Sequence, residues 1–347
     1  MTTQVRLATP DDYAPWDRYV TAHPEATPYH LVEWAIACER AYGHRHVCLL
    51  AEEGGRLAGI LPLSEVAVPF GARTFFGLPF CDVGGVLSDS ADVEQILVER
   101  ALEISRERRA SRIELRTRAS GHSVATTGAG DKVCMILALP ASADELFDSF
   151  KAKLRSQVRK ASKNGLEFHA GRSRSDLEKF YAVFSRNMRD LGSPVHSFAW
   201  FEAIRSLYGN NTLVAVVSMG NKPVGAGILL RAGVRVAVPW ASTLREFNRL
   251  APNMLLYWKL LEYATKAGCS EFDFGRSTYN EGTYRFKRQW GAAPVALSWM
   301  SITADGEVQK TASTSGAART LAESAWRRLP IPIANFAGPR IRKYIAL

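Results

Sequence analysis

One order of predicted elements occurs twice along the chain, and this repeat limits the fold more than any other feature. Residues 5–68 are predicted to form a strand, two helices and a hairpin, and residues 166–242 repeat this order with one further strand. The hairpin sequence G-G-R-L-A-G-I-L from Gly54 is echoed by G-N-K-P-V-G-A-G from Gly220. An internal repeat of this kind indicates two tandem domains of one architecture.

We therefore predict an α/β (α+β) chain with two domains, each a mixed central sheet flanked by helices, and with no coiled-coil arm. The domains are expected at residues 1–164 and 165–310. The first should end in one long basic helix over residues 143–163, whose apolar positions recur every three to four residues. Residues 311–347 are predicted to be a Ser/Thr-rich linker, a helix and a basic tail, packing on the first domain.

Charge and cysteine usage narrow the setting in which the chain works. The 44 basic and 34 acidic residues give a net charge of +10, which favours a polyanionic partner such as RNA, a phosphorylated precursor or an anionic membrane face. The five cysteines form no C-x-x-C pair and one must stay unpaired, as expected in a reducing cytoplasm. No signal peptide and no apolar run of about 20 residues is visible. We expect a cytoplasmic protein, in peripheral contact with the inner face of the membrane.

The stretch Cys269–Ala292 carries the clearest functional pattern. The stretch begins as a predicted buried strand, in which Phe272 and Phe274 alternate with Glu271, Asp273 and Gly275, and a polar loop and the run Y-R-F-K-R-Q-W follow. Ligands of open α/β sheets usually bind beyond the carboxyl ends of strands. Arg276, Lys287 and Arg288 would place positive charge there. The alternative is a strand, a turn and a solvated basic helix.

The predicted helix over residues 143–163 carries a second basic pattern. Lys151, Arg155, Arg159 and Lys163 recur at a spacing of four residues, and residues 151–163 contain six cations and no acid. Like charges at this spacing repel by a few tenths of a kcal/mol per pair. An anionic ligand bound by Arg155 and Arg159 would relieve that repulsion, and a soluble basic linker helix is the alternative.

Together these motifs resemble a known family. The strand ending in F-D-F-G-R-S, followed by G-T-Y-x-F-K-x-x-W-G-A, is similar to the C-terminal signature of the Fem (FemA/FemB/FemX) transferases. More narrowly, it resembles the FemAB-like proteins found with exosortase/PEP-CTERM exopolysaccharide systems. The resemblance implies two tandem GNAT-like domains that move an aminoacyl group from a charged tRNA to an amine of a peptidoglycan precursor. It also implies no tightly bound cofactor.

The resemblance assigns roles to particular residues. Lys287 with Phe286 matches the F-K pair that Fem enzymes use near the aminoacyl end of the donor, and we expect Lys287 on an exposed loop, neutralising phosphate or oxyanion charge. Arg276 would bind the anionic part of the acceptor. The residues expected to wall the substrate channel are Tyr284, Trp290 and Trp240.

Two further residues have a structural and a functional interpretation. Asp82 lies between aromatic and glycine residues, where it would orient or deprotonate an amine or simply form a turn. Asn253, at the start of a predicted helix, is either its cap or a donor to the acyl group. The sequence shows no Ser/His/Asp or Cys/His constellation, so direct attack without a covalent enzyme intermediate is predicted. No metal site is predicted.

Two departures from related patterns bear on the substrates. GNAT acetyltransferases place a glycine-rich loop between a strand and a helix to bind the coenzyme A pyrophosphate, whereas residues 245–253 contain no glycine. The lysine expected after the tryptophan of the second helix in muropeptide-binding Fem proteins is absent from W-A-I-A-C-E at Trp34. The alternatives are an acyl-CoA-dependent N-acyltransferase acting on an exopolysaccharide sugar and a non-catalytic binding protein of the polysaccharide machinery.

Overall fold

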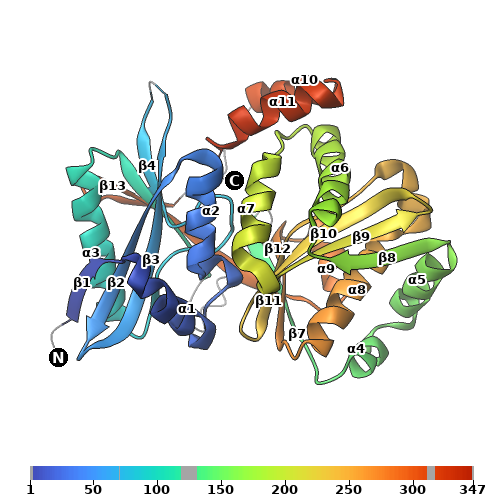
Figure 1. Ribbon diagram of the computed structural model, residues 1–347, viewed down its shortest axis with the longest axis horizontal. Coiled ribbons are helices and arrows are strands. Elements are labelled where there is room, and N and C mark those ends of the chain that lie inside the picture. Colours follow the sequence, from blue (N-terminus) through green and yellow to red (C-terminus); the bar gives the residue numbers. More distant parts are fainter. Residues whose placement is uncertain (1–2, 70, 119–130, 311–316, 346–347) are drawn as a thin grey trace. The chain divides into compact units, whose positions relative to one another are not determined.

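The structure is a computed structural model that describes residues 3–69, 71–118, 131–310 and 317–345. The chain forms two compact units (Figure 1). Unit 1 comprises residues 1–125, 296–314 and 343–347, and unit 2 comprises residues 126–295 and 315–342. The linker predicted at residues 311–316 lies outside the described residues.

Unit 1 is a mixed sheet covered by helices. Its strands follow the order β1-β2-β3-β4-β6-β13, with β5 on β3 and β14 on β13. The strands are β1 (Thr3–Leu7), β2 (Arg45–Glu53), β3 (Arg56–Ala67), β4 (Arg73–Phe76), β5 (Leu87–Ser88), β6 (Arg112–Arg118), β13 (Ala293–Thr303, in unit 1 from Ala296 on) and β14 (Val308–Lys310). The helices are α1 (Tyr13–Ala22), α2 (Val32–Tyr42) and α3 (Ala91–Glu107), with short 3-10 turns at Pro10–Asp12 and Pro28–His30.

Unit 2 repeats this architecture in the strand order β8-β9-β10-β11-β12-β7. Its strands are β7 (Lys132–Ala138), β8 (Leu166–Gly171), β9 (Thr212–Met219), β10 (Lys222–Ala232), β11 (Arg235–Thr243) and β12 (Glu271–Thr278). Its helices are α4 (Ala143–Ser149), α5 (Ala152–Lys163), α6 (Arg174–Leu191), α7 (Phe198–Tyr208), α8 (Pro252–Lys266), α9 (Gly282–Arg288), α10 (Ala317–Trp326) and α11 (Ile331–Arg342), with 3-10 turns at Gly209–Asn211 and Arg245–Leu250.

The two sheets match strand for strand. In each, four strands pair antiparallel, the fourth pairs parallel with the fifth, and an antiparallel strand closes the edge. The closing strands are exchanged between the repeats. β7 follows the first repeat in the chain but closes the sheet of unit 2, whereas β13 follows the second repeat and pairs with β6 of unit 1.

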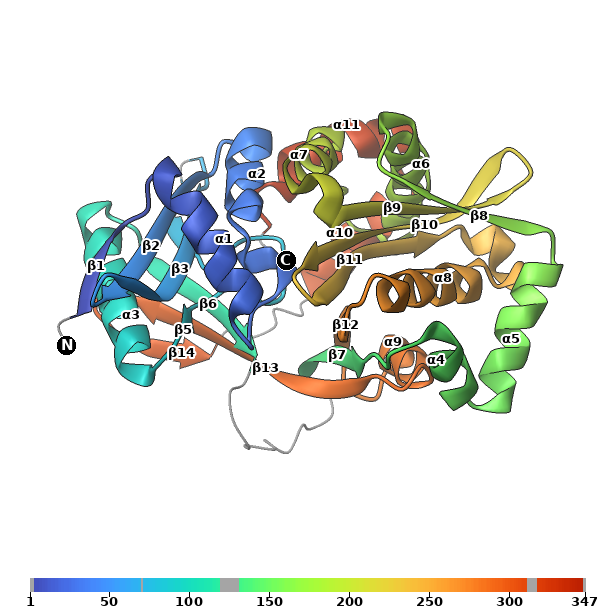
Figure 2. The same ribbon diagram turned by 60° about the horizontal axis from the view of Figure 1, so that its bottom comes forward.

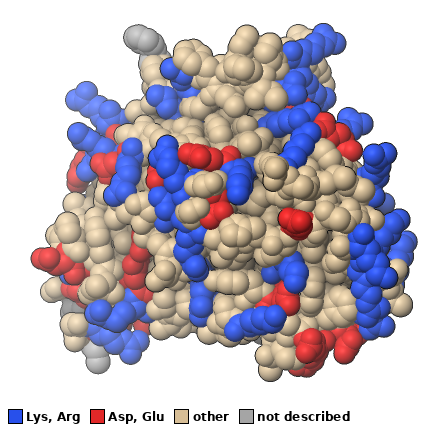
Figure 3. All heavy atoms as spheres, turned by 45° about the vertical axis from the view of Figure 1, so that its right-hand side comes forward, with Lys and Arg blue, Asp and Glu red and all other residues tan. Residues whose placement is uncertain are grey.

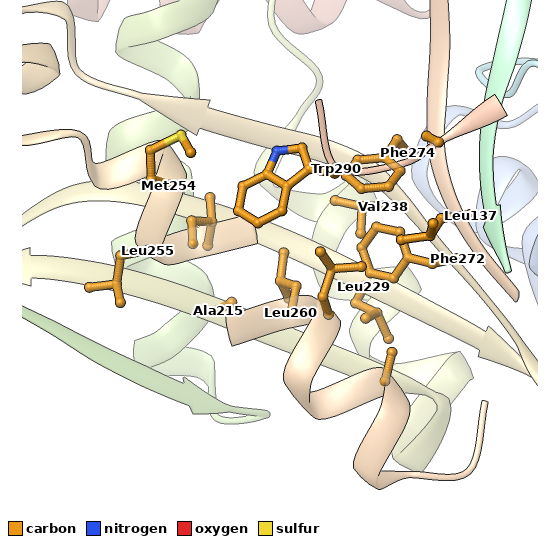
Figure 4. Packing of buried hydrophobic residues seen from close by; sticks show 14 of the residues in the cluster. Leu137, Ala215, Leu229, Val238, Met254, Leu255, Leu260, Phe272, Phe274 and Trp290 are labelled. Atoms are coloured by element: carbon orange, nitrogen blue, oxygen red, sulfur yellow. The ribbon is translucent and has the colours of Figure 1, made fainter. Parts of the chain in front are cut away.

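This exchange corrects the predicted domain boundaries. The segment of residues 126–164, expected to end the first domain, belongs to unit 2, because β7, α4 and α5 contribute apolar side chains to its core. Leu137, Phe150 and Leu154 lie in this core with Leu260 of α8 and Phe272 of β12. Figure 4 shows the close packing of Leu137, Leu260 and Phe272.

The predicted single helix over residues 143–163 is also corrected. It is two helices, because the backbone at Phe150 and Lys151 is extended, with ψ of 146° and 144°. The ring of Phe150 packs edge-on against Trp290, with ring centroids 5.4 Å apart. The chain leaves the helix where this side chain enters the core, and nothing local in the sequence, no glycine or proline, marks the break.

The C-terminal segment forms two helices, α10 and α11, where one helix and a tail were predicted. Both helices pack in unit 2, not on the first domain as predicted, whereas the tail from Lys343 on belongs to unit 1. In both ribbon views α11 lies beside α6 (Figures 1 and 2). Small residues permit this contact: a Cβ on Gly338 would lie 2.9 Å from the backbone nitrogen of Val195, so only glycine fits. Asn335 donates to the hydroxyl of Ser185 on α6. The helices α6 and α7 cover one face of the unit 2 sheet and α8 covers the other (Figure 2).

Candidate active site

The parallel strands of unit 2 diverge after a short paired stretch. β11 and β12 are in register only from Arg235 opposite Glu271 to Ala237 opposite Asp273. Beyond this point β12 carries a bulge where it pairs with β7, and Gly275 adopts a φ of +77°, which favours glycine. The Gly275 amide donates to Oδ1 of the buried Asp273, at 2.6 Å. The bulge therefore frees backbone carbonyls of β12 from regular ladder pairing.

Lys287 fills the role of hydrogen-bond donor to this bulge. Its Nζ donates to the carbonyl oxygens of Gly275, at 3.0 Å, and of Arg276, at 2.7 Å. The side chain is only 8% exposed and lies on α9, so the predicted exposed loop position is wrong. The cause is tertiary: the short helix α9 packs against β12. A positive charge consequently lies buried at the carboxyl end of β12.

Aromatic side chains surround this lysine along α9. Phe286 is half-buried and packs edge-on against Tyr257 of α8, with ring centroids 5.1 Å apart. Tyr284 is buried, and its ring centroid lies 4.9 Å from that of Tyr279. The guanidinium of Arg288 lies over the Tyr284 ring. The F-K pair therefore sits between the core of unit 2 and an aromatic-basic rim.

Trp290 and Trp240, two of the three residues predicted to wall the substrate channel, lie elsewhere in unit 2. Trp290 is fully buried and packs in the core between Phe150 and Phe286. Trp240 on β11 packs against Phe201 of α7, with centroids 5.0 Å apart, and so belongs to the sheet face that α6 and α7 cover. Because alternate strand residues point to opposite faces, Trp240 and the α8 face do not share a cavity.

The polar candidates Asn253 and Arg276 lie on the two elements that flank the divergence. Asn253 is half-buried in the first turn of α8, but the cap residue is Ala251, which makes no side-chain hydrogen bond. The cap interpretation of Asn253 is therefore wrong. Arg276 is half-buried on β12 and offers its carbonyl oxygen to Lys287. Their predicted contacts with the acyl group and the acceptor stay predictions.

Asp82 belongs to unit 1, in the segment of residues 77–85 that follows β4. Its backbone carbonyl accepts a hydrogen bond from the indole nitrogen of Trp299, at 3.1 Å. The amides of Gly84 and Gly85 both donate to the carbonyl of Arg116, so this segment lies along β6, where β4 has ended. The side chain of Asp82 is half-buried, and its role toward an amine stays a prediction.

The basic helix α5 presents its cations to solvent. Arg159 is exposed, with its guanidinium over the Phe147 ring at 5.3 Å, while Arg155 is half-buried and donates to the carbonyl of Asp148. A hollow of about 410 Å³ beside them is lined by Arg159, Lys163 and the ring of Trp258, among others. Lys and Arg side chains gather at the right of Figure 3, the side of the molecule where Figure 1 places α5.

A larger pocket of about 790 Å³ opens between β7, α4 and α9 of unit 2. Its apolar lining includes Leu139 and Phe150, and three cations line it, Lys151, Arg285 and Arg288. Sequence reasoning did not predict this pocket, because its walls come from three separate segments. It lies on the side of α9 that carries Arg285 and Arg288, whereas Lys287 of the same helix points to β12.

Sequence reasoning also missed two buried polar groups in the motif F-D-F-G-R-S. Asp273 holds the bulge through the Gly275 amide. The hydroxyl of Ser277 is buried and has no hydrogen-bond partner among the described residues. A buried hydroxyl without a partner is uncommon and marks a place where a ligand or water can bind. Both residues could have been selected as candidates from the sequence, since they belong to the motif itself.

A pair of carboxyl groups in unit 1 was not predicted either. Burial and the nearby negative charge of Asp17 raise the pKa of Glu33, and the two side chains share a hydrogen bond. Burial likewise raises the pKa of Asp17, whose Oδ1 accepts from the Val32 amide at 3.1 Å. The residues lie on α1 and α2, so protonation of this carboxyl pair is coupled to the packing of these two helices.

The chain was compared with known families and solved structures. Residues 148–288 match the family described as acetyltransferase (GNAT) domain. Unit 2 thus contains the segment that is similar to this acetyltransferase family. The crystal structure of FemX matches with a TM-score of 0.70 and 17% identity, over 84% of this chain and 95% of that one. A tandem GNAT protein from the clavulanic acid biosynthesis pathway matches with a TM-score of 0.54 and 13% identity, over 90% of this chain and 100% of that one. The predicted fold class of two tandem GNAT-like domains is confirmed.

One relative is similar to this chain in sequence. The UDP-N-acetylmuramoylpentapeptide-lysine N(6)-alanyltransferase of Weissella viridescens is 20% identical over 144 residues. The match covers 40% of this chain and 43% of that enzyme, so it spans less than half of either. In unit 2 of this chain, the turn between β11 and α8 is the 3-10 helix Arg245–Leu250, which contains no glycine.

Neither a metal centre nor a membrane span is visible in the part of the chain that the structure describes. No three His, Cys, Asp or Glu side chains gather there to hold a metal ion. The described helices also lack the combination of length and apolar character that crossing a bilayer requires. The five cysteines are buried and form no disulfide in the described residues.

Proposed function

We propose that the protein moves an aminoacyl group from a charged tRNA to an amine of a cell-envelope precursor. One observation carries this proposal: a GNAT domain places the ammonium of Lys287 on the carbonyls of a bulge where β11 and β12 diverge. The alanyltransferase to which the chain is similar supports the peptidoglycan-precursor class of acceptor. A lipid-linked exopolysaccharide precursor is the narrower acceptor that the sequence resemblance suggests.

The reaction proposed is direct aminoacyl transfer. The lone pair of the acceptor amine attacks the carbonyl carbon of the ester that joins the amino acid to the tRNA. The carbon–oxygen ester bond breaks, an amide bond forms, and the ribose hydroxyl leaves with one proton. Negative charge develops on the carbonyl oxygen in the transition state, where a pre-oriented cation is most effective. Lys287 supplies that cation, and its two carbonyl partners hold its orientation.

The remaining candidates have supporting roles in this proposal. Phe286 and Tyr284 hold the donor end against α9, Asn253 donates to the acyl group, and Arg276 binds an anionic part of the acceptor. Asp82 keeps the role predicted from the sequence, to orient or deprotonate an amine, as a proposal for unit 1 alone. No tightly held cofactor takes part.

A charged tRNA is favoured over acyl-CoA as donor. Coenzyme A binding in GNAT enzymes needs backbone amides of a glycine-rich turn to approach the pyrophosphate. The corresponding turn here ends at Ala251 in the left-handed region, with φ of 59°, and carries side chains throughout. The six cations of residues 151–163 instead suit a polyanion that contacts many phosphates.

An acyl-CoA-dependent N-acyltransferase is the second candidate, because the matching family is described by acetyl transfer. Isothermal titration separates the two. We expect charged tRNA to bind in the micromolar range and acetyl-CoA to bind more weakly than about 1 mM, which is less than roughly 4 kcal/mol of binding free energy. Transfer of a labelled amino acid from charged tRNA to UDP-N-acetylmuramoyl pentapeptide then tests the reaction. Micromolar binding of acetyl-CoA without binding of tRNA would replace the proposal by the second candidate.

A further inference from the structure

The last two helices expose apolar side chains that nothing in unit 2 covers. Leu321 on α10 is 74% exposed and Phe336 on α11 is 64% exposed, and Ile333 and Ile341 of α11 are exposed as well. The other exposed large apolar residues in the described part of the chain lie singly at element ends or turns, such as Met219 and Val234. A concentration of this kind on one pair of helices marks an interaction surface.

One face of α11 packs against unit 2. The other face, which carries the exposed apolar residues, is left uncovered by unit 2. Ala334 and Gly338 are buried, and Gly338 contacts the backbone of Val195. Nε of Arg342 lies 3.1 Å from Nε2 of His196, and burial together with the charge of Arg342 lowers the pKa of that histidine, which favours its neutral form as acceptor. The exposed apolar residues are therefore displayed by an anchored helix.

Basic side chains border the exposed apolar residues. Ile333, Phe336 and Arg340 are spaced by three and four residues, so they share one face of α11, and the Arg340 guanidinium lies 3.7 Å from the Phe336 ring centroid. Leu321 lies on α10, and the exposed Arg328, seven residues later, lies just beyond the end of this helix. Residues 324–345 contain five cations and no acid. The top of Figure 3, where α10 and α11 lie, shows an uncharged surface bordered by Lys and Arg.

We propose that α10 and α11 dock unit 2 on an anionic lipid bilayer, with Phe336 and Ile333 entering the headgroup region and Arg328 and Arg340 contacting lipid phosphates. This occupant fits the charge pattern, since the one acid of the two helices, Glu323, is paired with Arg327, and an amphipathic surface with an excess of arginines binds anionic lipid by burial and by attraction together. RNA would match the cations but would leave the aliphatic side chains in water. The docking goes beyond the proposed transfer reaction and does not depend on its donor or acceptor.

Vesicle co-sedimentation of the full chain tests the docking. The probes are vesicles of phosphatidylcholine alone and vesicles with roughly a third of phosphatidylglycerol, an anionic lipid. We expect binding to the anionic vesicles, weak binding to the neutral ones, and a loss of about tenfold or more for Ile333→Glu with Phe336→Glu. Arg328→Gln should weaken binding by about fivefold, the effect of one cation at an anionic surface.

A matched control distinguishes the effect of altering the α10 and α11 surface from the effect of adding negative charge. Met219→Glu with Val234→Glu adds the same two negative charges to exposed apolar positions elsewhere in unit 2 and should bind anionic vesicles as the native chain does. The proposal fails if the native chain does not bind anionic vesicles, or if the two double variants bind alike. It also fails if light scattering shows a dimer that Ile333→Glu with Phe336→Glu dissociates, because a second copy then covers the surface. Tryptophan fluorescence melts confirm that each variant is folded.

Discussion

Replacing Lys287 by methionine tests the buried ammonium at the end of β12. Methionine keeps most of the unbranched stem but removes the donor that the carbonyls of Gly275 and Arg276 share. Because the lysine is only 8% exposed, water has little access to these carbonyls in the variant. The substitution therefore changes stability as well as charge, which an exposed loop lysine would not do.

The size of the stability change follows from the two hydrogen bonds. A hydrogen bond from a charged group contributes about 1.5–3 kcal/mol, and partial rehydration recovers some of that in the variant. We therefore expect a loss of about 2–4 kcal/mol in the free energy of unfolding. For a unit of this size each kcal/mol shifts the unfolding midpoint by about 2–4 °C, so the midpoint should fall by roughly 10 °C.

Activity should fall by more than unfolding explains. If the ammonium compensates charge on the oxyanion, its removal should reduce turnover by roughly 100- to 1,000-fold, by analogy with the loss of one oxyanion donor. Aminoacyl transfer must be measured well below the midpoint of the variant, with folding confirmed by circular dichroism. Arg288→Gln is the matched control: this exposed residue of the same helix donates to neither carbonyl, so both the midpoint and turnover should stay near native values.

Two results would refute this reasoning. An unchanged midpoint in Lys287→Met would show that the two carbonyl hydrogen bonds do not stabilise the bulge. A lowered midpoint with native turnover in the folded variant would make Lys287 purely structural and would place the chemistry away from β12 and α9.

Three further predictions concern other parts of the molecule. Arg155→Gln with Arg159→Gln should weaken tRNA binding and flatten the log–log salt dependence by roughly 1.5, as expected for two lost phosphate contacts, in a titration from low to high salt; an unchanged slope would return α5 to a solvated helix. Because the pKa of Glu33 is raised in the folded state, unit 1 should lose stability as the pH rises from the ordinary value of 4.5 through the raised one, and Glu33→Gln should remove most of that loss in urea melts at pH 5 and pH 8. Gly338→Ala should already detach α11, since its Cβ would meet the Val195 backbone, and limited proteolysis should then cut near residue 330 faster than in the native chain.

The sequence by itself determined the architecture and the stretch in which the site is proposed. The repeated order of elements predicted two matching sheets, because alternation and helical periodicity are local properties of the chain. The motif F-D-F-G-R-S likewise placed β12, its glycine and the lysine that follows on one short stretch. The glycine-free turn before α8 could also be recognised from the residues alone.

Tertiary structure decided which surfaces these elements present. β7 and β13 carry no local mark of the sheet they join, and their exchange follows from which core buries their side chains. Phe150 breaks the predicted long helix because its ring enters the core beside Trp290, and Trp240 faces α7 because of its register on β11. Lys287 is buried because α9 packs on β12 and brings its ammonium to carbonyls eleven and twelve residues earlier. Burial and long-range hydrogen bonding depend on the whole fold, and a residue type with its neighbours in sequence cannot reveal them.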